Sequence, residues 1–245
     1  MGKGKLLKFN ELLSFEHVVQ APFNVVEHND FQLKGKWGKE FFKNENPLIL
    51  ELGCGKGEYT VALAEKNPGV NYMGVDIKGA RLWRGAKLAK EQGLTNVGFL
   101  RANIEQITQF YGASEVAEIW LTFPDPQMEK TRKRLTSTTF LNKYREFLKP
   151  GGIIHLKTDS NFQYNYTREL VKLNKFEILA ETDDVYEWEH LDDTLRIRTF
   201  YEKQWLDRGI KIKYIAFRLG TGEFLEPDVE IEKDEYRSFG RSARE

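Results

Sequence analysis

The chain has 245 residues, of which 40% are hydrophobic and 13% aromatic, enough to bury the core of one domain with extensions. No stretch approaches the roughly 20 apolar residues of a membrane span, and the basic start lacks the apolar core of a secretory signal, so we expect a cytoplasmic protein. A single cysteine excludes an internal disulfide, and the four scattered histidines predict no metal site. Because 37 basic residues are balanced by 37 acidic ones, any contacts with nucleic acid must come from local patches.

The chain divides into three predicted regions. Residues 1–45 carry aromatic side chains among charges without sustained periodicity, which indicates an N-terminal extension packed on the core. Residues 46–225 repeat an order of apolar run, turn and amphipathic stretch, which is typical of a doubly wound α/β domain with a mostly parallel sheet and helices on both faces. Residues 226–245 are rich in charge and poor in apolar side chains, so we expect a C-terminal tail with loose order.

Apolar runs bounded by turns predict seven strands, over residues 48–52, 71–75, 97–100, 119–123, 153–157, 177–180 and 213–218. Helical spacing of apolar positions predicts helices over residues 58–66, 79–91, 138–148, 162–173 and 199–208. Pro150, Gly151 and Gly152 end the third of these helices, because proline cannot continue a helix and glycine tolerates the reversing turn.

A run of alternating glycines follows the first predicted strand directly. Gly53, Gly55 and Gly57 precede a helix, and glycines there let the backbone turn sharply and bring N–H groups near a ligand. The dinucleotide fingerprint requires glycine or alanine where this chain has Glu58, so a pyrophosphate is not favoured. Glu51, just before the turn, would repel phosphates and suits a cationic amino group or sulfonium instead.

Two polar residues follow the next two predicted strands. Asp76 comes 19 residues after Gly57, near the spacing at which an acid accepts the ribose hydroxyls of a nucleoside, and so indicates an adenosine moiety. Asn103 stands where a further polar group could read the adenine edge. With Glu51 and the glycine loop, these features resemble the seven-stranded Rossmann-like methyltransferases that bind S-adenosylmethionine. In the alternative interpretation the glycines only form a tight turn.

The fourth predicted strand runs into Pro124, Asp125 and Pro126. In open α/β sheets the catalytic crevice lies beyond the carboxyl ends of central strands, so we expect Asp125 to face the transferred methyl group. The flanking prolines restrict the backbone and hold the carboxylate in place. Four of the five residues from Lys130 to Arg134 are basic and suit phosphate contacts, the alternative being a solvated run of charge.

The chain resembles the bacterial-type tRNA guanine-N7 methyltransferases from about Asn46 to Phe217. The motifs that carry the resemblance are Pro-Asp-Pro at 124–126 with its basic stretch, Lys-Thr-Asp at 157–159 and Thr-Phe-Tyr-Glu at 199–202. Gln127 departs from the tryptophan that commonly follows Pro-Asp-Pro in the family, and the basic stretch is shorter. The resemblance implies methyl transfer from S-adenosylmethionine to N7 of a guanine in tRNA.

Individual roles also follow from the resemblance. It implies a catalytic role for Asp125, in orienting the guanine. The residues implied for the cofactor are Glu51, Gly53, Gly55, Asp76, Asn103 and Asp125. The residues implied for the tRNA nucleotide are Lys130, Asp159, Thr199, Phe200, Tyr201 and Glu202. Two alternatives stay open, in which Asp159 caps the helix that follows it, and Glu202 is a surface acid paired with Lys203 or Arg198.

A second group of basic residues lies on and just before the helix predicted over residues 79–91. Its members recur every three residues, a spacing that keeps neighbours close while the stripe winds slowly round the helix. They are Lys78, Arg81, Arg84, Lys87 and Lys90. One interpretation is a solvated face, and the other is a contact with RNA made together with the lysine-rich N-terminus.

Rival functions remain for the same residues. A methyltransferase of this fold could act on another base or a small molecule, although methylation of an exocyclic amine generally uses a Pro-Pro-aromatic turn that this chain lacks. A non-catalytic RNA-binding subunit would have no need for Glu51, Asp76 and Asp125. A nicotinamide-dependent oxidoreductase conflicts with Glu51 and Glu58. The sequence leaves the oligomeric state open between monomer and homodimer.

Overall fold

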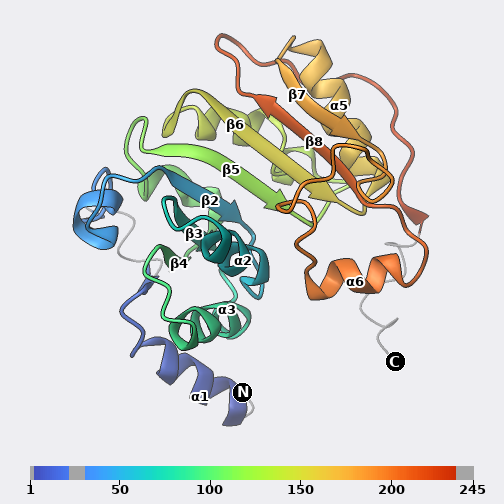
Figure 1. Cartoon of the computed structure of the whole chain (residues 1–245). Coiled ribbons are helices and arrows are strands. Elements are labelled where there is room, and N and C mark those ends of the chain that lie inside the picture. The colour runs from blue at the N-terminus through green and yellow to red at the C-terminus, as the bar shows by residue number, and fades with distance from the viewer. Residues whose placement is uncertain (1–2, 22–30, 236–245) are drawn as a thin grey trace.

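The computed structural model describes residues 3–21 and 31–235. These residues form one sheet in the order β1, β4, β3, β2, β5, β6, β8, β7 (Figure 1). The strands are β1 (Val18–Gln20), β2 (Leu48–Leu52), β3 (Asn71–Val75), β4 (Val97–Arg101), β5 (Val116–Thr122), β6 (Leu148–Thr158), β7 (Ile178–Thr182) and β8 (Lys213–Arg218). All neighbouring pairs are parallel except that β8 runs antiparallel to both β6 and β7. The mostly parallel α/β sheet expected from the sequence is confirmed.

Within the described residues the structure has one strand more than the seven expected, and some element ends shift. β1 has only three residues, too short to show an alternating pattern, and pairs with β4 at the sheet edge. β6 begins at Leu148 because that residue pairs with Val116 of β5. The helix expected over residues 138–148 therefore ends at Tyr144.

The helices cover both faces of the sheet. α2 and α3 pack on one face, with α1 outside α3, while α4 and α5 pack on the other (Figure 1). The bounds are α1 (Lys3–Leu12), α2 (Glu58–Lys66), α3 (Gly79–Glu91), α4 (Thr138–Tyr144), α5 (Asn161–Leu173) and α6 (Phe200–Leu206), with a π-helix η2 (Trp37–Phe42) and 3-10 turns η3 (Ile104–Gln109) and η4 (Thr131–Lys133). None of the helices described is long and apolar enough to cross a membrane.

The hydrophobic core lies in two clusters, one on each face of the sheet. Leu50, Met73 and Ile119 belong to the cluster under α4 and α5, whereas Tyr59 and Phe99 belong to the cluster under α2 and α3. All residues of β2 and of β3 are buried, because helices cover both faces. This burial explains why those strands read as nearly continuous apolar runs in the sequence.

Hydrogen bonds of Trp37 and His17 are among the contacts that fasten the N-terminal extension to the core. Trp37 is fully buried, and the Glu115 carboxylate accepts a hydrogen bond from its backbone N–H at 2.8 Å. His17 Nε2 donates to the Ala86 carbonyl at 2.8 Å and so joins the segment before β1 to α3. The packing expected for this extension is thus seen outside residues 22–30, which include Phe23 and His28 and are not described.

The tail packs against the core over its described part. Asp234 is buried, and its carboxylate accepts a hydrogen bond from the Ser160 hydroxyl just before α5. Glu226 accepts one from the Thr138 N–H at the start of α4, at 2.8 Å. The expectation of loose order is therefore wrong here, because tail carboxylates satisfy donors at the N-termini of two helices. Residues 236–245 lie outside the described part.

The strand order sets the position of a crevice. After β2 the chain moves outward through β3 and β4, and then returns to place β5 on the other side of β2. At such a reversal of strand order the connections leave in opposite directions, and a crevice opens beyond the carboxyl ends of the two central strands. Glu51 stands near that end of β2, and Thr122 at that end of β5.

Candidate functional site

The loop between β2 and α2 turns through left-handed backbone. Gly53, Gly55 and Gly57 have φ angles of 80°, 57° and 68°, a region that residues with a Cβ rarely adopt. The N–H groups of Gly53 and Cys54 donate to the Val75 carbonyl at 2.8 and 3.1 Å, which ties the loop to the end of β3. The turn itself therefore needs these glycines, which both interpretations of the loop require.

Two glycines bring this loop into backbone contact with α3. A Cβ on Gly57 would lie 2.6 Å from the Phe99 ring, and a Cβ on Gly85 would lie 2.7 Å from the carbonyl oxygen of Lys56. Neither position has room for a methyl group. The loop and α3 are consequently held against each other without side chains between them.

Glu51 presents a carboxylate that is buried between two hydroxyl groups. Thr60 and Thr122 each donate a hydrogen bond to one of its oxygens. Burial raises the pKa of Glu51 to about 7, with the two hydroxyl donors opposing the rise and the nearby charge of Asp76 adding to it. A cation in the pocket would favour the ionised form, because it offsets the cost of burying a negative charge.

Asp76 follows β3, and two backbone donors fix its carboxylate. Gly55 donates to one oxygen at 3.0 Å, and Lys78 donates to the other at 2.7 Å. The side chain is 9% exposed. An ionised carboxylate has about four acceptor positions, so Asp76 keeps capacity for ligand hydroxyl groups after both backbone bonds are made.

Six of the twelve site residues predicted from the sequence line one pocket at the crevice. They come from separate segments of the chain. The predicted residues in its lining are Glu51, Gly53, Gly55, Asp76, Thr199 and Tyr201. The pocket encloses about 100 Å³, less than the roughly 300 Å³ of a small ligand site, so a nucleoside would extend into the open crevice. Among the described residues no group of His, Cys, Asp and Glu side chains is placed to hold a metal ion.

The first turn of α6 forms one side of this pocket. The backbone N–H of Phe200 donates to the Glu58 carboxylate at 2.8 Å, which joins the first residues of α6 and α2. The Nζ of Lys56 lies 3.5 Å from the centroid of the Phe200 ring, and Phe200 is 46% exposed. Tyr201 lies in the lining and Phe200 outside it, so aromatic surface for a planar ligand lies in and beside the pocket.

Two residues predicted for the cofactor lie outside the lining. Asn103 caps η3, with its side-chain oxygen accepting from the Glu105 N–H at 3.0 Å. Asp125 is exposed, and its Oδ1 accepts from the Gln127 N–H at 3.2 Å. Phe123, which does line the pocket, has a φ of 50° and turns the chain out of β5. Asp125 thus stands two residues beyond the lining.

The basic stretch after Asp125 divides into anchored and exposed residues. Arg134 is buried, and its guanidinium donates to two backbone carbonyls of the preceding turn. Lys133 forms an ion pair with Glu105 at 2.5 Å. Lys130 and Arg132 are exposed. Arg134 therefore shapes the turn, whereas Lys130 keeps the exposure that its predicted phosphate contact needs.

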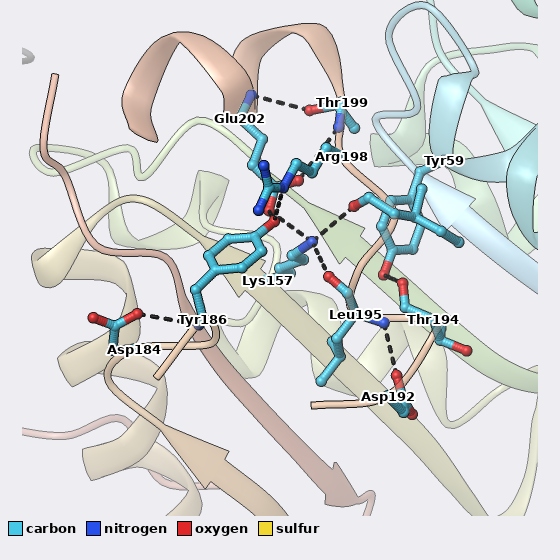
Figure 2. A network of polar contacts seen from close by, with 11 residues as sticks. Tyr59, Lys157, Asp184, Tyr186, Asp192, Thr194, Leu195, Arg198, Thr199 and Glu202 are labelled. Atoms are coloured by element: carbon cyan, nitrogen blue, oxygen red, sulfur yellow. Dashed lines mark hydrogen bonds and ion pairs between the residues drawn. The ribbon is translucent and has the colours of Figure 1, made fainter. Parts of the chain in front are cut away.

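A buried ion pair joins two of the sequence motifs (Figure 2). Lys157 Nζ lies 2.7 Å from Glu202 Oε1, and both side chains are fully buried. The same Nζ donates to the carbonyls of Leu195 and Ile197 at 2.8 and 2.9 Å. Burial lowers the pKa of Lys157, and the Glu202 carboxylate opposes that effect. The pair fastens α6 and the segment before it to β6.

Glu202 is an internal residue. It also accepts a hydrogen bond from the Tyr186 hydroxyl at 2.7 Å, and that hydroxyl accepts one from Arg198 Nε at 3.2 Å (Figure 2). Its ion-pair partner is Lys157 and not Lys203 or Arg198, so the surface-pair alternative is wrong. The contact predicted between Glu202 and the tRNA nucleotide is not available in this conformation, since the carboxylate has no exposed surface.

The same glutamate closes the start of α6. The Thr199 hydroxyl accepts from the Glu202 N–H at 3.2 Å, and the Glu202 carboxylate accepts from the Thr199 N–H at 3.3 Å. This reciprocal arrangement is a capping box, which satisfies two donors that a helix start otherwise leaves unpaired. Thr199 reaches the pocket lining from this fixed position.

Asp159 lies inside the protein at the end of β6. It is fully buried, and its charge opposes the lowering of the Lys213 pKa, of which burial is the main cause. The cap of α5 is Ser160, whose hydroxyl accepts a backbone N–H of the first turn at 2.9 Å. The alternative in which Asp159 caps this helix is therefore wrong.

Sequence reasoning gave no role to Lys157 or Tyr186. A lysine that ends an apolar strand is a usable signal for Lys157, because a buried ammonium group requires a partner. Tyr186 lies in a segment without regular secondary structure, and no spacing in the sequence connects it with Glu202. Thr60 and Thr122, which hold Glu51, were likewise not singled out by the sequence pattern.

Comparison with known proteins gives a consistent result. Residues 45–215 match the model of a family described as "Putative methyltransferase". A tRNA (guanine-N(7)-)-methyltransferase of Bacteroides thetaiotaomicron is 55% identical over 245 residues, which cover 100% of this chain and 97% of that protein. The protein of the same name from Porphyromonas gingivalis is 53% identical over 236 residues, covering 94% of this chain and 97% of that protein.

Solved structures with a similar fold differ widely in sequence. The 16S rRNA methyltransferase KamB matches with a TM-score of 0.58 at 13% identity, over 75% of this chain and 92% of that chain. An antibiotic-related methyltransferase matches with a TM-score of 0.54 at 18% identity, over 74% of this chain and 90% of that chain. These likenesses show the Rossmann-like methyltransferase fold.

Proposed function

Because the chain belongs to the tRNA (guanine-N(7)-)-methyltransferase family, we propose that it transfers the methyl group of S-adenosylmethionine to N7 of a guanine in tRNA. The observation that carries the proposal is the pocket at the crevice, where Glu51, Asp76 and the glycine loop meet the first turn of α6. A tRNA substrate supports a cytoplasmic location for the enzyme.

The pocket residues fit S-adenosylmethionine by their chemistry. Three carboxylates, Glu51, Glu58 and Asp76, line a small space together with the cations Lys56 and Arg81. Glu51 suits the cationic end of the cofactor, and Asp76 suits the ribose hydroxyls. When bound, the cofactor supplies an electrophilic methyl group on its sulfonium. Asn103 remains a proposed adenine contact from its position just after β4.

The residues beyond the pocket would orient the guanine. N7 carries an in-plane lone pair and no proton, so transfer requires alignment and not prior deprotonation. The exposed Asp125 carboxylate has a free oxygen that would accept from the guanine N1–H and exocyclic amine and offset the positive charge that develops on the ring. The exposed Phe200 ring and the Tyr201 ring would stack on the base.

Methylation of bulk tRNA with labelled S-adenosylmethionine, followed by nucleoside analysis, tests the proposal. We expect 7-methylguanosine, and any other labelled nucleoside would refute N7 of guanine as the target. Calorimetry with S-adenosylmethionine tests the rival in which the chain is a non-catalytic RNA-binding subunit. Absence of both binding heat and methylated product would leave that rival in place of the proposed enzyme.

We expect Asp125→Ala to reduce kcat by at least about 100-fold, because an orienting and charge-balancing group is lost. The Kd for S-adenosylmethionine should stay within about twofold, since Asp125 lies outside the pocket lining. Asp193→Ala, a change at another exposed aspartate, is the matched control and should keep the wild-type kcat. A nearly normal rate for Asp125→Ala would remove this residue from the mechanism.

A further inference from the structure

A basic groove lies between α1 and α3, and we call it the α1–α3 groove. It has a volume of about 520 Å³. Its charged and aromatic lining side chains are Lys8, Lys56, Arg81, Trp83, Arg84, Lys87 and Glu91. Five of these are cations and one, Glu91, is an acid, in a chain whose net charge is zero. Positive charge is therefore concentrated in this groove, although the chain as a whole is neutral.

The indole of Trp83 organises one wall of the groove. Lys8 Nζ lies 4.7 Å and Lys87 Nζ lies 5.1 Å from the centroid of its ring. The indole N–H donates to Glu11 at 2.7 Å, and Glu11 also lies 3.9 Å from Lys87 Nζ. Cations drawn from two helices are thus placed around one rigid aromatic group, with a single acid from α1 beside them.

The two arginines of the groove are available to a ligand. Neither the Arg81 nor the Arg84 guanidinium has a hydrogen-bond or ion-pair partner among residues 3–21 and 31–235. On a solvated face the charged side chains would point apart into water. Here Lys8 of α1 instead lies in the same groove as the cations of α3. Gathering like charges raises their mutual repulsion, which a bound polyanion would relieve.

The α1–α3 groove adjoins the cofactor pocket. Lys56 and Arg81 line both of them. Lys56 also lies over the exposed Phe200 ring at the pocket mouth. An anionic strand in the groove would therefore continue directly to the place where the base is methylated. This continuity favours RNA over a membrane surface, since a lipid headgroup has no reason to be led to a methyl donor.

We propose that the α1–α3 groove holds the phosphate backbone of the tRNA whose guanine enters the pocket. The inference rests on the proposed function for the identity of the RNA, and it adds the surface on which that RNA is held. Arginine suits this role because its planar guanidinium pairs with phosphate oxygens in a fixed geometry. Contacts of this kind position the strand without reading its bases.

Arg84→Glu tests the proposal, because Arg84 lines the groove but not the cofactor pocket. In filter binding with bulk tRNA at about 0.1 M salt, we expect the Kd to rise about five- to tenfold or more. For Arg84→Ala the slope of log K against log salt should fall by about one. The matched control is Lys66→Glu, a charge reversal at an exposed residue that ends α2.

Activity measurements separate this proposal from the proposed function. Arg84→Glu should raise KM for tRNA while kcat and the Kd for S-adenosylmethionine stay near wild type. Equal effects of Arg84→Glu and Lys66→Glu on tRNA binding would overturn the groove and leave the enzyme assignment intact. Loss of binding to phosphatidylserine vesicles, with tRNA binding unchanged, would also overturn it. A product other than 7-methylguanosine, with the Arg84 effect retained, would refute only the proposed function.

Discussion

Glu51 lines the pocket proposed for the cofactor, and its carboxyl group has a pKa near neutrality. Its pKa of about 7 in the folded protein lies above the ordinary value of 4.5, mainly through burial. At a pH between 4.5 and about 7, Glu51 therefore holds a proton more often in the folded protein than in the unfolded chain. The contribution of Glu51 to the free energy of unfolding therefore decreases as the pH rises through this range.

We expect S-adenosylmethionine to bind more tightly as Glu51 ionises. From about pH 7.5 to about pH 6 the Kd should increase by up to about tenfold, because the fraction of binding-competent protein falls by that factor. Calorimetry in buffers of different ionisation enthalpy measures both the Kd and the proton released. Glu51→Gln should bind weakly with no such slope, and a wild-type Kd that ignores pH would contradict the role of Glu51.

Removal of one partner from the Lys157–Glu202 pair leaves a buried charge without compensation. We expect Glu202→Ala to lower the free energy of unfolding by about 3 to 5 kcal/mol, measured by chemical denaturation. Glu187→Ala, at an exposed glutamate, should cost less than about 0.5 kcal/mol.

A second variant separates the unpaired charge from lost packing. Glu202→Leu combined with Lys157→Met removes both charges, and we expect it to be more stable than Glu202→Ala. If Glu202→Ala cost less than about 1 kcal/mol, the pair would not be what fastens α6 to β6.

At this scale the sequence predicted the residues whose role depends on neighbours along the chain. The glycine loop and Asp76 follow from the backbone chemistry of a strand, a turn and a fixed spacing. Glu202 was different, because its burial depends on Lys157 on β6 and Tyr186 in a loop. No local pattern around residue 202 contains that information.

Among the elements, α6 depends most on its surroundings. It has seven residues, and helices this short are not stable by themselves. The capping box and the buried pair therefore hold it in place, with Thr199 and Tyr201 on the pocket. Its helical character was predictable from the sequence, but its attachment to β6 was not.

The tail is a second element whose position decides stability. Asp234 accepts hydrogen bonds at the start of α5, and we expect Asp234→Ala to lower the free energy of unfolding by about 1 to 3 kcal/mol, because it leaves buried donors unsatisfied. Thermal or chemical denaturation measures the change. Asp228→Ala, at an exposed residue of the same segment, should be neutral, and equal effects of both would contradict the anchoring role.

For the whole molecule, the alternation of strands and helices was enough to predict the fold class, since it leaves few arrangements for a parallel sheet. The α1–α3 groove was only partly foreseen. The basic stripe on α3 was visible in the sequence, but α1 was not predicted, and its position brings Lys8 to Trp83. Pairing between distant helices of this kind has no periodic signal in the chain.

The cofactor pocket joins both halves of the sheet, so its occupation should stabilise the whole domain. At about 100 times its Kd, S-adenosylmethionine should raise the free energy of unfolding by about 2.7 kcal/mol. A thermal-unfolding series in increasing cofactor measures this effect. Asp76→Asn should reduce it, and a wild-type domain that gained no stability would show that the cofactor does not bind the folded protein.

The close contact between the loop at Gly57 and α3 at Gly85 bears on the distance between the α1–α3 groove and the proposed methyl donor. No side chain separates the loop from α3, so the two segments are in direct backbone contact. If the tRNA backbone is held along α3 as proposed, the guanine that meets the methyl donor would be the one at the right distance along the strand. The site would then select its nucleotide by its distance from the groove, without reading the bases between.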